Sequence, residues 1–77
     1  MNKGTRKQLS EIIDGLQGFQ ASLEEIADEE QDKADSMPEN LQSSERHDKF
    51  EEIADNLHDA SSNIDDVIDL IQEVIDK

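Results

Sequence analysis

Two long segments of the chain carry apolar residues at intervals of three and four, so that two heptad positions repeat along each segment. In the first segment these positions hold Leu9, Leu16 and Leu23, and Ile12, Phe19 and Ile26. In the second segment they hold Phe50, Leu57, Ile64 and Ile71, and Ile53, Ala60, Val67 and Val74. This spacing places each set on one face of an α-helix. No hairpin turn separates alternating apolar runs, as a β-sheet would require, so the sequence predicts an all-α fold with two amphipathic helices.

The residues around these segments predict where the helices begin and end. Thr5-x-x-Gln8 has the pattern of a capping box, and Ser43 or Ser44 can cap the second helix. The segment between them contains the only proline, Pro38. We therefore predict one domain composed of a helix over about residues 6–34, a connection over about 35–44 and a helix over about 45–76.

The two apolar stripes match in length when the second helix returns antiparallel to the first, as a short connection requires. Pairing residues whose numbers sum to 83 places Leu9 against Val74. Further apolar residues lie beside the stripes, and we expect two hairpins to bury them in a homodimeric four-helix bundle. The alternatives are a helix of another protein in the second hairpin's place, or an isolated hairpin in equilibrium with a disordered chain. The residues expected at the contact between hairpins are Ile13, Phe19, Ile68 and Ile75.

The charge of the chain narrows the range of partners. With 21 acidic and 7 basic residues, the formal net charge is −14. Such a charge repels nucleic acid and anionic lipid, so we expect no direct nucleic-acid or membrane binding and a protein partner with a basic surface. No segment has the run of apolar residues that a membrane span needs. Cysteine is absent, which excludes disulfides and cysteine-based zinc sites and fits a cytoplasmic location.

No arrangement of residues in the sequence predicts catalysis. Asp55-x-x-His58 is similar to the Glu-x-x-His motif of di-iron helical bundles, whose ligands project into the core. His58 follows the stripe residue Leu57, however, and is expected to point outward. The sequence contains neither a calcium-binding loop nor a phosphate-binding glycine motif. We therefore predict a non-enzymatic protein with no catalytic residues, no metal site and no cofactor.

Carboxylates are concentrated in residues 24–39, where Lys33 is the only basic residue. Repeated along a rigid helix, they can present negative charge as a nucleic-acid backbone does, and so attract a basic groove made for DNA or RNA. The alternative is that the charge only keeps a small helical protein soluble. If the charge is functional, the residues expected to bind a partner are Glu24, Glu25, Asp28, Glu29, Asp32, Asp35, Glu39 and Arg46.

The connection from Met37 to Arg46 contains Pro-Glu-x-Leu-Gln and Ser-Glu-Arg elements between two acidic helices. Over about residues 24–57 the chain resembles small acidic proteins encoded by phages and prophages of Gram-positive bacteria. The resemblance implies a phage-derived protein that disables or redirects a host protein, such as a nucleic-acid-handling enzyme or a defence system. We therefore predict a helical interaction protein that inhibits or modulates a host protein through a basic surface. The alternative is a structural or assembly role, as a coiled-coil scaffold whose charge only aids solubility.

Overall fold

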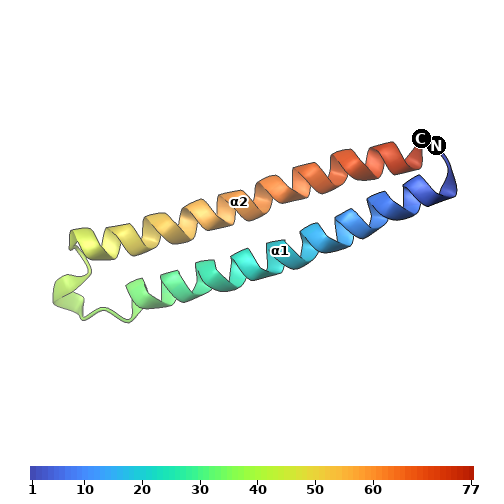
Figure 1. Ribbon diagram of the computed structural model, residues 1–77. Coiled ribbons are helices and arrows are strands. Elements are labelled where there is room, and N and C mark those ends of the chain that lie inside the picture. Colours follow the sequence, from blue (N-terminus) through green and yellow to red (C-terminus); the bar gives the residue numbers. More distant parts are fainter.

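The computed structural model describes residues 1–77 and consists of two long helices that lie side by side (Figure 1). Helix α1 spans Lys3–Asp35 and helix α2 spans Glu45–Asp76, with a short 3₁₀ helix, η1 (Glu39–Leu41), between them. The chain reverses direction around η1, and its two termini meet at the other end of the molecule. No strand is present. The predicted all-α, antiparallel two-helix hairpin is therefore confirmed.

The N-terminal cap of α1 differs from the one expected. Asn2, rather than Thr5, precedes the first turn, and its side-chain Oδ1 accepts a hydrogen bond from the backbone N–H of Thr5 at 2.8 Å. Asparagine is as good a helix cap as serine or threonine, and it stands earlier in the chain, so α1 begins at Lys3 rather than at about residue 6. The expected capping box at Thr5 was wrong. At α2 the hydroxyl of Ser44 accepts from the N–H of His47 at 3.3 Å, so Ser44 is the cap.

The connection is short because its backbone groups are satisfied locally. The N–H of Ser36 donates to the carbonyl of Asp32 at 2.9 Å and closes the last turn of α1. Pro38 disfavours helical geometry in the residue before it, which separates α1 from η1. The N–H of Leu41 then donates to the carbonyl of Pro38 at 2.8 Å and forms the 3₁₀ turn. This geometry returns the chain for antiparallel packing.

Contacts between the helices give their register. The ammonium of Lys33 lies 5.9 Å from the centre of the Phe50 ring, and these residue numbers sum to the expected 83. Halfway along the hairpin, Gln20 donates from its side-chain Nε2 to the backbone carbonyl of Ser61 at 2.8 Å. These numbers sum to 81. The helices are therefore aligned along their length within about two residues of the predicted pairing.

The faces that meet are only partly the predicted ones. Ile12 and Phe19 were expected between the helices, yet they are 50% and 67% exposed, and Val67 and Val74 are also exposed. The buried positions are Ile13, Ala27, Ala34, Ala54 and Ser61. One predicted heptad position of each helix remains between the helices, and the other is replaced by the residue that follows it. Each helix is thus turned by about half a residue step, roughly 50°, from the expected orientation. Four of the five buried residues are small, and larger apolar side chains such as Leu16 and Leu57 are half-buried beside them.

We define the seam as the buried and half-buried side chains between α1 and α2. On α1 it consists of Leu9, Ile13, Leu16, Gln20, Leu23, Ala27 and Ala34, and on α2 of His47, Phe50, Ala54, Leu57, His58, Ser61, Ile64, Ile68, Ile71 and Ile75. The Cα trace measures 60 × 15 × 11 Å, which is one layer of helices. No large side chain is fully buried. A single layer cannot enclose a core, because a second layer is needed to cover its apolar surface.

Neither helix is long and apolar enough to cross a membrane.

Candidate functional site

Large apolar side chains are exposed along one side of the seam. We call this set the apolar face, and its members are between 43% and 67% exposed. They are Ile12, Phe19 and Ile26 on α1, and Val67 and Val74 on α2. Scattered exposed apolar residues are normal on a protein surface. An ordered row on both helices is not scattered, and such a surface indicates a binding interface.

The two rows belong to the same side of the hairpin, because of their place relative to the seam. Ile12 stands immediately before seam residue Ile13, and Val67 stands immediately before Ile68. One residue step turns an α-helix by about 100°. Viewed along the hairpin, successive residues turn clockwise on one helix and anticlockwise on the other, because the two helices run in opposite directions. The seam residues of the two helices also point in opposite directions, toward each other. Residues that precede the seam therefore project to one common side of the hairpin.

The opposite side of the seam carries aspartate. One seam position recurs every seven residues on each helix and lies at the centre of the seam. Its nine members are Ile13, Gln20, Ala27 and Ala34 on α1, and His47, Ala54, Ser61, Ile68 and Ile75 on α2. In seven of these nine cases an exposed Asp follows directly. Ala21 and Ser62 occupy the other two positions. The aspartates are Asp14, Asp28, Asp35, Asp48, Asp55, Asp69 and Asp76. By the same geometry these side chains project away from the apolar face. The hairpin therefore has one apolar side and one acidic side, a division that the repeated apolar–seam–Asp triplet encodes.

The carboxylates predicted to bind a partner extend along the loop-side half of α1. Glu25, Asp28, Glu29, Asp32 and Asp35 are all exposed. We call these five residues the α1 acidic row. Glu24 is half-buried and contacts α2 instead. The α1 acidic row lies on the outer and Asp-bearing sides of α1, and the structure therefore places it away from the apolar face.

The other two predicted partner-binding residues lie at the loop end. Glu39 is exposed at the start of η1. The guanidinium of Arg46 lies 5.7 Å from the centre of the Phe50 ring, and the ammonium of Lys33 lies 5.9 Å from the same centre. Arg46 and Lys33 both line a hollow with Met37. The structure thus separates Arg46 from the α1 acidic row with which the sequence analysis grouped it.

Three of the four residues expected at the contact between hairpins lie within one hairpin. Ile13 is buried in the seam, and Ile68 and Ile75 are half-buried there. Only Phe19 is exposed and free to contact another molecule. The sequence analysis missed Ile12, Ile26, Val67 and Val74 as exposed residues, because it assigned them to the seam. The Asp that follows seven of the nine central seam residues is the signal that could have identified the correct face.

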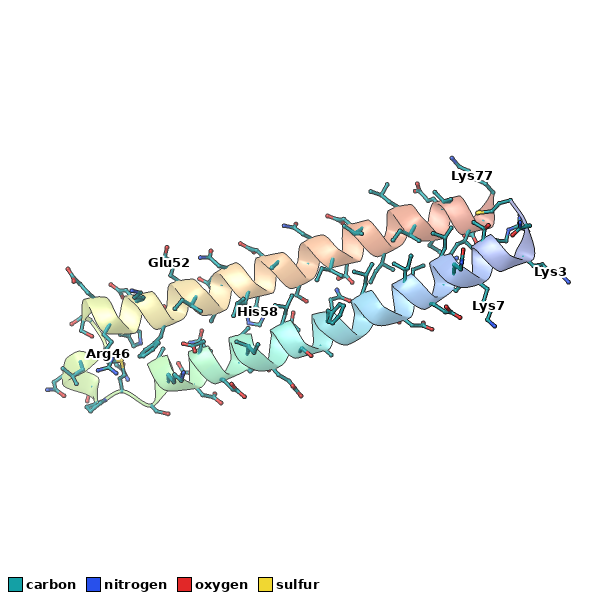
Figure 2. The ribbon with its side chains drawn as sticks, in the orientation of Figure 1. Lys3, Lys7, Arg46, Glu52, His58 and Lys77 are labelled. Carbon is teal, nitrogen blue, oxygen red and sulfur yellow. The ribbon has the colours of Figure 1, made fainter.

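His58 is the second correction. It was expected to point outward, but Figure 2 shows its side chain between the two helices, whereas Glu52 points away from α1. The His58 Nδ1 lies 2.9 Å from Oε2 of Glu24. With Asp28, these two side chains form a group whose possible metal-ligand atoms all lie within 4.8 Å of one another. The turn of α2 relative to expectation, roughly 50°, brings His58 inward.

The other histidine has a different environment. His47 is largely buried at the loop end of the seam, where its Nε2 lies 3.2 Å from Glu51 and its Nδ1 lies 3.8 Å from Asp48. The two carboxylates therefore contact opposite nitrogens of the ring. One ion cannot be shared by groups arranged on opposite edges of an imidazole, so His47 does not form a comparable cluster.

Comparison with known proteins adds no relative. No family model, curated protein or solved structure matches this chain. The resemblance of the Met37–Arg46 connection to small acidic phage proteins therefore stays a prediction.

Proposed function

We propose that this chain is a non-enzymatic interaction protein that pairs with a second copy through its apolar face and binds a basic protein through its carboxylates. The observation that carries the proposal is the division of the hairpin into an apolar side and an acidic side. The two sides require two kinds of partner. An apolar surface is stabilised by another apolar surface, and a carboxylate surface attracts cations.

A second copy is the partner that fits the apolar face. The face extends along both helices of a single-layer hairpin, and a second hairpin supplies a row of equal length and the missing layer. Side chains that are now about half exposed each gain about 1 kcal/mol when covered. Pairing in this way forms a four-helix bundle and leaves the aspartates of both copies directed outward.

The charges at the loop end favour one orientation of the two copies. Lys33 and Arg46 each precede a seam residue, so they extend the side that carries the apolar face. A parallel arrangement of hairpins would place these cations against their counterparts in the other copy. An antiparallel arrangement separates the two pairs by most of the 60 Å length of the hairpin, so we propose a two-fold symmetric antiparallel pair.

The acidic exterior is the surface proposed to act on another protein. Two copies bring together twice the net charge of −14 on one rod, which attracts a basic surface, including a groove built for nucleic acid. The α1 acidic row supplies the carboxylates for this contact. The resemblance to small phage proteins supports a host protein as the partner, and occupation of its basic surface would inhibit or modulate it.

Charge reversal tests the acidic contact without touching the seam, the apolar face or the His58 cluster. In the triple variant E25K/E29K/D32K, every changed residue is exposed on α1. The matched control is D59K/D66K/E73K, with the same change of charge on exposed residues of α2. Wild type is used to recover a partner from bacterial lysate, and the purified partner is then titrated with each form by calorimetry.

We expect the α1 variant to lose most of its affinity, the α2 control to keep more of it, and both to remain helical by circular dichroism. Wild-type affinity should fall as NaCl is raised to about 0.5 M, where exposed charges are screened. Equal affinity of wild type and the α1 variant would refute the assigned surface. Recovery of self-assembled chain alone would favour the scaffold role.

A further inference from the structure

Glu24, Asp28 and His58 form the one place on the hairpin where a nitrogen ligand and two carboxylates converge from both helices. Glu24 and Asp28 are four residues apart on α1, which places them on the same face of the helix one turn apart. His58 reaches them from α2, and its Nδ1 lies 2.9 Å from the Glu24 carboxylate. The possible ligand atoms of all three lie within 4.8 Å of one another. No other group of three such residues is this close.

The ligand chemistry selects a class of ion. Imidazole is a good ligand for zinc, copper and nickel, and carboxylates complete many zinc sites. A site of carboxylates alone would suit magnesium or calcium, which prefer oxygen ligands. The presence of His58 therefore distinguishes this group from the many exposed acidic pairs elsewhere on α1 and α2.

The distances and the accessibility also fit. Ligand atoms of a tetrahedral zinc site stand about 3.5 Å apart, given metal–ligand distances of ~2.0–2.2 Å. The present separations close to that spacing by a movement of about an ångström. Glu24 and His58 have the freedom to make it, since their side chains are 45% and 42% exposed. The exposed side of the group leaves room for water as a fourth ligand.

We propose that Glu24, Asp28 and His58 bind one divalent transition-metal ion per chain, of the class represented by Zn²⁺. The ion joins α1 to α2 midway along the hairpin. Because the carboxylates lie on the acidic side of the seam, the site stays open when the apolar face is covered. It is therefore independent of the pairing of two copies.

Metal binding at this site competes with a proton. A carboxylate only accepts hydrogen bonds, so the 2.9 Å contact between His58 and Glu24 requires a proton on Nδ1. Metal ligation by that nitrogen moves the ring proton to Nε2, so the ion binds the neutral ring. Acid weakens binding because it adds a second proton to the ring. The strong negative charge of the chain acts in the opposite direction and concentrates cations around the site.

The test is calorimetric titration of the full chain with ZnCl₂ in chelator-free buffer at neutral pH, with NMR observation of both histidine rings. We expect saturable binding of one Zn²⁺ per chain, a shift of the His58 ring signals and unchanged His47 signals. H58A and D28A should each bind at least tenfold more weakly. H47A and E29A are the matched controls, which remove the other histidine and a neighbouring exposed carboxylate, and both should bind as wild type does. An excess of Mg²⁺ should not displace Zn²⁺.

Several results would overturn the assignment. They are the absence of saturable Zn²⁺ binding, wild-type affinity in H58A or D28A, equal loss in H47A or E29A, and displacement by Mg²⁺. D28A guards against a folding artefact, because it leaves the His58–Glu24 contact intact and introduces a better helix former. Circular dichroism of each variant verifies that helicity is retained before titration.

Discussion

The two sides of the seam differ in chemistry although they are separated by only two positions in sequence. Around seam residue Ile13, the residue before is Ile12 and the residue after is Asp14. The same order recurs at Ile26 and Asp28 on α1, and at Val67 and Asp69 on α2. A helix turns these two neighbours of a seam residue about 200° apart, to opposite sides.

This comparison shows that the heptad of this chain specifies more than a two-helix contact. Adjacent apolar residues such as Ile12 and Ile13, or Val67 and Ile68, give one row for the seam and a second row that is exposed. The aspartate that follows prevents the apolar surface from extending to the other side, because burial of an unpaired carboxylate is strongly unfavourable. The triplet therefore leaves one side of the hairpin open to the additional layer that we propose.

The largest expected effect is that of a charge introduced into the apolar face, compared with the same charge on the acidic side. Phe19 precedes seam residue Gln20, and the exposed Ala21 follows it. F19E should weaken pairing of the two copies by roughly 3–6 kcal/mol, or about 10²–10⁴-fold, because a buried Phe is lost from each copy. A21E places the same charge on the acidic side and should leave pairing unchanged. Sedimentation equilibrium of both variants measures this difference, and equal dissociation constants would contradict it.

Ile12 and Ile13 are adjacent in sequence, but Ile12 belongs to the apolar face and Ile13 to the seam. Ile13 is 7% exposed and Ile12 is 50% exposed. I13A should lower the free energy of unfolding by about 2–4 kcal/mol, since it removes a buried side chain from the hairpin itself. I12A should lower it by only about 1 kcal/mol, and only at concentrations where the dimer is populated. Urea unfolding at two protein concentrations distinguishes the two, and a reversed order would show that the seam is misassigned.

The smallest expected effect is at the glycines of α1. A Cβ added at Gly18 or Gly15 would meet nothing within 4 Å in the single hairpin. G18A should therefore stabilise the chain by about 1 kcal/mol, the helix preference of alanine over glycine. Gly15 lies one turn from both Ile12 and Phe19, at the border of the apolar face, so G15A should gain less if a second copy packs there. Thermal unfolding of both variants measures the difference; a loss of stability in G18A would contradict it.

Spacing alone was sufficient for the helices and their approximate register. The heptads of apolar residues predicted two antiparallel helices, and the pairing of Lys33 with Phe50 agrees with the predicted sum. Spacing was not sufficient for the orientation of each helix. Where Ile12 and Ile13 are adjacent, or Val67 and Ile68, the same pattern permits either residue in the seam. In the structure Ile13 and Ile68 lie in the seam, at the same heptad positions as the small buried residues Ala27, Ala34, Ala54 and Ser61.

The candidate site depended on that orientation. The carboxylates of the α1 acidic row were identifiable from composition, because exposed acidic residues need no specific neighbour. The contact of His58 with Glu24 could not be predicted, because it requires the correct frame on both helices at once. The cap at Asn2 was accessible in principle, since asparagine is a preferred cap residue, but Thr5 offered a competing pattern.

The molar mass of the wild-type chain in solution tests the central claim most directly. Static light scattering after size-exclusion chromatography should give twice the 8.7 kDa of one chain at tens of micromolar, with circular dichroism that shows a fully helical protein. A mass of 8.7 kDa for a stably helical protein under the same conditions would contradict the account, because the apolar face would then remain uncovered.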